Sequence, residues 1–267
     1  MNWFENILKV LDAKMQTPTS YGWFHLLCLL IMIVLIVVVC LTCRNLSSKQ
    51  FRIITLVVSI ILILFEVYKQ LNFSFDSNSG NWRYQWYAFP FQFCSTPMYV
   101  LFLIGVLKEN KFQNYLCSFI ATFGLFAGIS VMLYPNDVFV STIGINIQTM
   151  VHHGAMVVMG IFMYVSKRVE FKHKTILKGA CVFICLVLIA LALNIIFHYS
   201  GNTSTFNMFY ISPYFGCHLP ILSIIYSNMP YIVFLLIYIF GFVLCGYIVL
   251  LIAMGINKFQ SFLRNKK

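Results

Sequence analysis

The stretch that decides the fold is YGWFHLLCLLIMIVLIVVVCLTC, residues 21–43, a long apolar run without Asp, Glu, Lys or Arg. An α-helix needs about 20 such residues to cross the ~30 Å hydrocarbon core of a bilayer. Its apolar side chains lie all round the helix instead of on one stripe, as in a helix that faces lipid. Tyr21–Cys43 is therefore predicted to span a membrane.

The same pattern recurs along the chain. The composition agrees, because only 9% of the residues are charged and 61% are hydrophobic, against roughly 25% charged in a soluble domain. No soluble fold has enough interior to bury that much apolar surface. We predict one all-α integral membrane domain over residues 1–267 with seven spans. The six further spans are Phe51–Leu71, Phe89–Leu107, Tyr115–Leu133, Ile147–Ser166, Ile176–Tyr199 and Met229–Ile256.

Basic residues give the orientation of these spans. The loops after the first, third and fifth spans, together with the C-terminal tail, carry 14 of the 18 Lys and Arg residues. By the positive-inside rule, the N-terminus is outside and the C-terminus is cytoplasmic. The net charge of +11 is therefore explained by topology, and we expect no nucleic-acid partner. Abundant Ile, Phe, Asn and Lys are typical of an AT-rich genome, which favours a bacterial cytoplasmic membrane.

The residues before the first span predict a short helix in the outer interface. Their apolar side chains recur at helical spacing: Trp3, Phe4, Ile7, Leu8 and Leu11. No apolar run precedes Tyr21, so no cleavable signal peptide is expected.

Polar residues inside the predicted spans gather at one depth. A charged side chain at mid-bilayer costs roughly 2.5–3.5 kcal/mol on insertion scales, so such residues are candidates for function. The orientation places nearly all of them in the outer half, and only His173 among the histidines on the cytoplasmic side. We therefore predict one polar chamber near the outer surface. Its candidate members are His25, Glu66, Gln92, Cys94, Gln148, His152, His153, Asn194 and His198.

The segment Phe89-Pro-Phe-Gln-Phe-Cys-Ser-Thr-Pro97 is the most unusual one. Pro90 fits the first position of a helix, and Pro97 is expected to kink that helix beside Cys94. This placement puts Cys94 in a first turn, where the helix dipole favours a thiolate. A histidine of the fifth span at similar depth would complete a nucleophile–base pair.

Alternatives remain open at these positions. Cys94 is also interpretable as a small apolar residue or as the disulfide partner of Cys217. His152 and His153 point about 100° apart on a helix, so at most one faces Cys94 squarely. Glu66 is also interpretable as a local pair with Lys69 or Gln70 that reaches the interface. His25 is also interpretable as an interfacial residue.

Three further features complete the pattern. The histidines lack the spacing typical of metal ligands, and we expect neither a metal nor another cofactor. Asn207–Met229 is long and interrupted by prolines, which indicates a re-entrant or surface-lying piece over the chamber. Gly124 and Gly128 form a GxxxG pattern typical of close helix packing.

Taken in order, five short motifs resemble a known family. They are His25 early in the first span, Pro90-Phe-Gln-Phe-Cys94, Tyr134-Pro135, His152-His153, and Asn207-Met-Phe-Tyr210 before the last span. This layout resembles the YwaF-like bacterial integral membrane proteins, which are related to animal transmembrane protein 164. The resemblance covers nearly the whole chain, and the order and depth of the motifs carry it.

The resemblance implies a specific chemistry. The animal relative is regarded as a phospholipid acyltransferase with a cysteine nucleophile at the position of Cys94, which makes His153 or His152 the base. We accordingly predict an enzyme of acyl transfer or acyl-lipid remodelling near the outer leaflet, with membrane lipids as partners. The residues around Cys94 leave the acyl donor and acceptor open. Residues predicted to bind substrate are Gln92, His25, Glu66 and Asn207.

Two other classes of function remain as alternatives. A permease or transporter for a small or lipid substrate also lines a cavity with polar residues, but these are expected to continue into the cytoplasmic half. A seven-helix sensor fits the topology, although short loops leave little room for a cytoplasmic partner. The sequence leaves the oligomeric state open.

Overall fold

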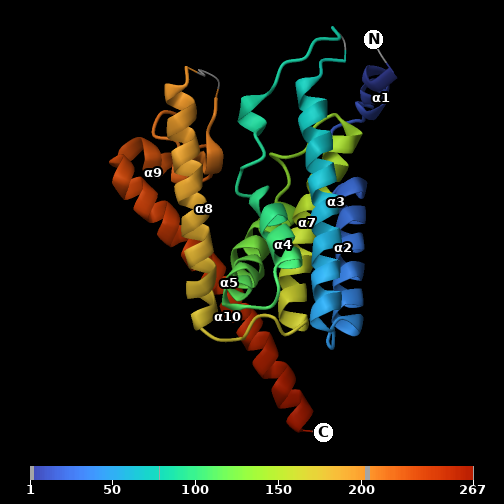
Figure 1. The fold of residues 1–267 in the computed structure, drawn as a ribbon, viewed down its shortest axis with the longest axis vertical. Coiled ribbons are helices and arrows are strands. Elements are labelled where there is room, and N and C mark those ends of the chain that lie inside the picture. Colours follow the sequence, from blue (N-terminus) through green and yellow to red (C-terminus); the bar gives the residue numbers. More distant parts are fainter. Residues whose placement is uncertain (1–2, 78, 202–204, 267) are drawn as a thin grey trace.

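Long apolar helices lie side by side in the computed structural model, which describes residues 3–77, 79–201 and 205–266 (Figure 1). No strand occurs in these ranges, where two isolated β-bridges are the only extended pairings. Five segments are long and apolar enough to cross a membrane. The chain is therefore an all-helical, multi-pass membrane protein, as the sequence predicts. The five segments are α2 (Trp23–Thr42), α3 (Ser48–Ser74), Lys111–Leu133, α8 (Lys174–Tyr199) and α10 (Tyr231–Asn265).

The predicted third span, Phe89–Leu107, is an α-helix only in its second part. Helix α4 (Thr96–Val106) has 11 residues, which is ~16 Å at 1.5 Å per residue and shorter than the hydrocarbon core. The residues before it form a 3₁₀ turn, η1 (Trp86–Ala88), and an irregular segment. Pro97 lies in the first turn of α4, where its missing N–H removes no hydrogen bond. Pro97 thus begins this helix, and the expectation that it kinks a helix begun at Phe89 was wrong.

Helix α7 (Ile143–Val165) is the centre of the bundle. It has 23 residues and packs against α2, α3 and α6 (Leu125–Leu133). Polar residues in its N-terminal half lower its hydropathy, and it is not among the five candidate spans. Those polar residues are buried inside the bundle instead of facing lipid: Asn146, Gln148, Thr149, His152 and His153. The count of seven spans and the orientation stay predictions.

The segment Lys111–Leu133 passes through the interior beside α7. It consists of α5 (Lys111–Phe119), the π-helical turn η2 (Ile120–Gly124) and α6. A Cβ atom on Gly128 would lie 2.8 Å from the carbonyl oxygen of His153. Gly128 therefore lets α6 approach the backbone of α7 closely, as the GxxxG pattern predicts. Gly124 has more space, because its Cβ would meet no atom nearer than 3.7 Å.

Arg168 ties together the loops that are predicted to be cytoplasmic. Its Nη1 lies 2.8 Å from Oε2 of Glu109, and its Nη2 donates to Ser48 Oγ at 3.3 Å. Its guanidinium also lies 4.8 Å from the ring centroid of Phe51. These contacts join the α2–α3, α4–α5 and α7–α8 connections at one end of the bundle.

The N-terminal helix α1 (Trp3–Leu11) lies at the opposite end (Figure 1). Asp12, which follows it, accepts hydrogen bonds from Lys14 Nζ at 2.6 Å and Ser77 Oγ at 2.8 Å. Partial burial opposes ionisation of this carboxyl, but hydrogen bonds from Lys14, Ser77 and Asn72 outweigh it and hold the pKa of Asp12 below its ordinary value. The predicted N-terminal helix is thus present and is tied to the end of α3.

The segment after α8 folds back onto the bundle. It contains a short turn, η3 (Met208–Tyr210), and helix α9 (Leu222–Asn228). Its first part is buried against the C-terminal half of α8, while its second part lies on the surface beside α10 (Figure 1). The described part of the predicted covering segment therefore packs over the end that holds Cys94.

Candidate functional site

Cys94 lies in the turn that leads into α4. The backbone N–H groups of Ser95 and Thr96 both donate to Gln92 O, at 2.8 and 3.1 Å, and Thr96 Oγ1 donates to Phe93 O at 2.9 Å. The turn therefore places the thiol just before a helix N-terminus, one residue earlier than Ser95, the N-cap. Cys94 and Cys217 are both free thiols, so the alternative of a disulfide between them is not realised.

Three amide side chains hold the covering segment beside this turn. Gln92 donates from Nε2 to Asn207 O at 3.0 Å and accepts at Oε1 from Phe209 N at 3.0 Å. Asn194 of α8 holds Met208 in the same two-sided way, at 3.0 and 2.7 Å. The Asn207 amide closes the segment on itself through Gly216 O and Ser212 N. We call these three residues the amide clamp.

The amide clamp holds a strained backbone. Phe209 and Tyr210 both have positive φ angles, 59° and 56°, a conformation that aromatic residues rarely adopt without support from their surroundings. Tyr210 is consequently held within electrostatic range of the Cys94 and Cys217 thiols. Gln92 and Asn207, predicted to bind substrate, have both amide groups engaged in this structure. Asn194 is a positioning residue for which the sequence offered one signal, an amide inside an apolar helix.

The two histidines of α7 differ in the ring atom that each leaves free. His153 Nδ1 lies 2.8 Å from Thr149 O, and because a carbonyl only accepts, Nδ1 carries the proton. The Nε2 of His153 is therefore a free lone pair. His152 Nδ1 lies 3.0 Å from Gln148 Nε2, whose amide accepts from Thr149 Oγ1 on its other side. The proton of His152 is therefore on Nε2, which is buried and has no partner in the described part of the chain.

Glu66 and Lys69 of α3 form a buried ion pair. Lys69 Nζ lies 2.7 Å from Glu66 Oε1, which also accepts from Gln70 Nε2 at 2.8 Å. The Glu66 side chain is 4% exposed and that of Lys69 is 17% exposed, so the predicted local pair is present and is largely buried in the bundle. Glu66 Oε2 is buried and lacks a hydrogen bond to any described residue.

The ion pair connects the cysteine to the histidines. The Lys69 charge lies within electrostatic range of Cys94, His152 and His153, and the Glu66 charge also acts on Cys94. The turn before α4, the end of α3 and the first half of α7 therefore meet around Lys69. Within the described ranges, the Cys94 thiol has no hydrogen bond to either histidine. The nucleophile–base pair of Cys94 with a histidine of α7 therefore stays a prediction.

Both ring nitrogens of His25 form hydrogen bonds to the backbone, away from Cys94 in the chain. Its Nδ1 accepts from Tyr21 N at 2.9 Å, and its Nε2 lies 2.9 Å from Met132 O, to which it donates. The ring is completely buried and joins the start of α2 to the end of α6. The predicted contact of His25 with substrate would require breaking one of these bonds. Across the described residues, no three His, Cys, Asp or Glu side chains form a group suited to a metal ion.

The comparisons with known proteins agree with this architecture. The search of curated proteins gave no match, and the search of solved structures likewise gave none. The model of the TMEM164 family matches residues 19–254, a range that includes α2, the Cys94 turn, the α7 histidines and most of α10. The resemblance that His25, Cys94, His152-His153 and Asn207–Tyr210 carry is thereby confirmed. This multi-pass membrane protein belongs to the TMEM164 family.

Proposed function

We propose that this chain is a membrane-embedded acyltransferase, or acyl-lipid remodelling enzyme, with Cys94 as nucleophile and His153 as general base. The observation that carries the proposal is the tautomer of His153, whose Nδ1–H is bound by Thr149 O and whose Nε2 lone pair remains to accept a proton. Cys94 and His153 share the electrostatic surroundings of Lys69. A nucleophile, a base and a carbonyl that orients the base are the elements that covalent catalysis requires.

In the first half-reaction, the Cys94 thiol proton passes to His153 Nε2. The thiolate sulfur attacks the ester carbonyl carbon of a phospholipid, and the carbonyl becomes a tetrahedral oxyanion. When the oxyanion collapses, the bond to the alkoxide breaks and His153 returns the proton to the leaving oxygen. The products are a lysolipid and an acyl thioester on Cys94.

In the second half-reaction, the hydroxyl of an acceptor lipid replaces the departed lysolipid. His153 Nε2 takes the proton of that hydroxyl while its oxygen attacks the thioester carbonyl. The C–S bond breaks, the proton goes to the sulfur, and Cys94 returns to the thiol. The sequence of steps exchanges an acyl chain between lipids and consumes no cofactor.

His152 supplies a donor where negative charge develops. Its Nε2–H is buried and unpartnered among the described residues, and it lies next to the base in the chain. A preorganised donor to an oxyanion contributes about 2.7–4 kcal/mol to transition-state stabilisation. Lys69 and Glu66 place one positive and one negative charge within electrostatic range of Cys94. We thus assign the base to His153 and the oxyanion donor to His152.

The predicted topology indicates the leaflet at which the proposed reaction takes place. With the N-terminus outside and seven spans, Cys94 lies toward the outer leaflet of a bacterial cytoplasmic membrane, where ester carbonyls are found. Polar side chains of the site are concentrated on that side of the bundle, which supports an enzyme more than a transporter with a continuous polar path.

The experiment is an intact-lipid profile of membranes that contain the wild type, Cys94→Ala or His153→Ala at equal expression. Cys245→Ala and His198→Ala are matched controls, because Cys245 is another half-buried thiol and His198 is an exposed histidine. The proposal predicts acyl-chain remodelling that both site variants abolish and both controls retain. Identical lipid profiles for the wild type and Cys94→Ala would refute acyl transfer and leave the polar chamber as a binding or transport site.

A further inference from the structure

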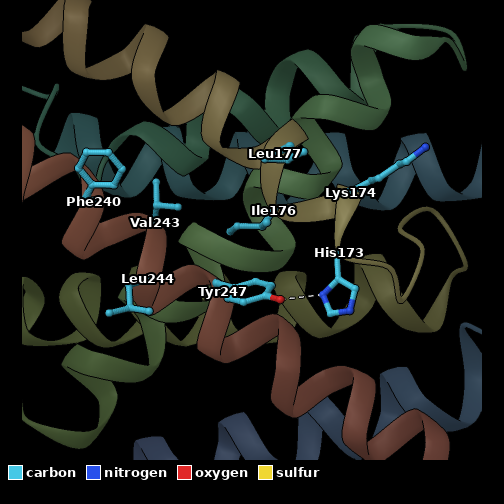
Figure 2. A pocket seen from close by; sticks show the side chains of 8 residues that line it. All are labelled: His173, Lys174, Ile176, Leu177, Phe240, Val243, Leu244 and Tyr247. Carbon is cyan, nitrogen blue, oxygen red and sulfur yellow. Dashed lines mark hydrogen bonds between the residues drawn. The ribbon is translucent and has the colours of Figure 1, made fainter.

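A pocket of about 450 Å³ lies between α8 and α10 and is separate from the site around Cys94 (Figure 2). Its volume is in the range of small-molecule sites, about 300–1,000 Å³. It lies near the start of α8, about 25 Å along the helix from Asn194 at 1.5 Å per residue. The lining residues are His173, Lys174, Ile176, Leu177, Phe240, Val243, Leu244 and Tyr247.

Most of the residues that line this pocket have apolar side chains. Ile176 forms a buried floor at 7% exposure, whereas Leu177, Phe240 and Leu244 are 65%, 70% and 59% exposed. In a membrane-spanning bundle, such outward-facing apolar walls contact lipid chains and not water. The pocket is therefore a groove open to the bilayer, and its shape suits an acyl chain that lies between two helices.

One end of the groove is polar. The Tyr247 hydroxyl and His173 Nδ1 are 2.8 Å apart (Figure 2). If the phenol donates, His173 keeps a free Nε2–H, and if the ring donates, Tyr247 keeps a free O–H. In either arrangement the pair retains one donor for an anion.

Lys174 adds positive charge near this end, and its side chain extends away from the His173–Tyr247 pair (Figure 2). Lys174 has no ion pair within the described ranges; the nearby Glu170 carboxylate pairs with Lys172 at 3.0 Å and lies within electrostatic range of Lys174. This end belongs to the basic, predicted cytoplasmic side. Basic pockets between membrane helices on that side are suited to phospholipid head groups, and a cation with an N–H or O–H donor complements a phosphate.

We propose that this groove binds an anionic phospholipid of the cytoplasmic leaflet. One acyl chain lies along Leu177, Phe240 and Leu244, and the phosphate lies at Lys174 and the His173–Tyr247 pair. The assignment depends on the predicted orientation and not on acyl transfer at Cys94.

Native mass spectrometry of the full chain tests this assignment. The protein is transferred from nanodiscs that hold equal amounts of phosphatidylglycerol and phosphatidylcholine with identical chains, and the retained lipids are counted. Wild type is expected to retain phosphatidylglycerol preferentially. Lys174→Gln is expected to weaken this retention about fivefold, as for the loss of one interfacial lysine, and Tyr247→Phe to weaken it as well. Lys258→Gln removes the same charge from the exposed C-terminal part of α10 and is expected to retain the lipid.

Three results would overturn the assignment: equal retention of the two lipids by wild type, unchanged retention by Lys174→Gln, or an equal loss in Lys258→Gln. Cys94→Ala is expected to retain phosphatidylglycerol as wild type does. Because this variant lacks the proposed nucleophile but keeps the groove, its lipid retention tests the groove proposal independently of the acyl-transfer proposal.

Discussion

At the scale of single residues, the two neighbouring histidines of α7 differ in the hydrogen-bond partner of Nδ1. That partner determines which ring nitrogen carries the proton, and so which role we propose for each histidine. Thr149 offers a carbonyl to His153, and Gln148 offers an amide N–H to His152. One ring is left with a lone pair at Nε2 and the other with a proton. Two adjacent residues of one type are thereby set up as a base and a donor.

Replacement by glutamine separates the two roles. A glutamine N–H can replace the donor of His152, whereas glutamine cannot accept a proton as a base. We expect His153→Gln to lower acyl transfer at least 100-fold, since general bases typically contribute 10²–10⁴-fold, and His152→Gln to retain most of the activity. The measurement is acyl-chain exchange in reconstituted vesicles.

His152→Phe, which has no donor, is the companion variant. It is expected to lose about 10²–10³-fold, the effect of removing one oxyanion donor. The assignment fails if His153→Gln stays active while His152→Gln is inactive.

The amide clamp can be tested at one backbone group, the N–H of Phe209. Gln92→Leu leaves the Phe209 N–H without its acceptor, and an unsatisfied buried group costs about 1–3 kcal/mol. Hydrogen exchange of the 207–212 amides is therefore expected to accelerate. Gln85→Leu is the control, because the half-buried Gln85 side chain donates to the neighbouring Arg83 O and does not contact the 207–212 segment through any hydrogen bond between described residues. Unchanged exchange in Gln92→Leu would show that the clamp does not hold this segment.

At the scale of helices, the contact of α6 with α7 sets the position of the base. Gly128→Ala would place a methyl group 2.8 Å from His153 O, whereas at Gly124 the nearest atom is 3.7 Å away. Overpacking a tight contact costs about 1–3 kcal/mol. We therefore expect Gly128→Ala to lower the thermal unfolding midpoint and activity, and Gly124→Ala to preserve both. Equal midpoints for the two variants would contradict this packing.

The helices differ in how accurately the sequence predicts their boundaries. The apolar runs of α2 and α8 are continuous, so their hydropathy alone places both ends within two residues. The start of α10 is placed equally well, but the helix continues nine residues beyond the predicted end at Ile256, to Asn265. The start of α4 was misplaced because Pro90 fits a helix start, whereas in the structure the residues from Phe91 to Ser95 form a turn in which Gln92 binds the backbone of Asn207 and Phe209. The contact of Gln92 with Phe209 joins residues that are far apart in the chain, and no local pattern indicates it.

At the scale of the whole molecule, polar chemistry is divided between the two ends of an apolar bundle. Cys94, the Glu66–Lys69 pair and the α7 histidines belong to the turn before α4, the last part of α3 and the first half of α7. Arg168 and the proposed lipid groove lie instead at the α7–α8 connection and the start of α8. The positive-inside rule predicts that the second end is cytoplasmic. The two proposals together place acyl transfer at one leaflet and the lipid groove at the other.

Reporter fusions at the two termini test that orientation. With the N-terminus outside and the C-terminus inside, a C-terminal fluorescent protein is expected to fluoresce and a C-terminal alkaline phosphatase to be inactive. Phosphatase fused at the N-terminus, behind a signal sequence, is expected to be active. An active C-terminal phosphatase would reverse the orientation and move Cys94 to the cytoplasmic leaflet.

The central claim is that Cys94 carries an acyl group during turnover. Its most direct test is the intact mass of the purified protein after brief exposure to phospholipid vesicles. We predict one acyl adduct on wild type that hydroxylamine removes and that Cys94→Ala lacks, with Cys245→Ala still acylated. A wild-type protein that remodels lipid without an adduct, or an adduct that persists in Cys94→Ala, would contradict the claim.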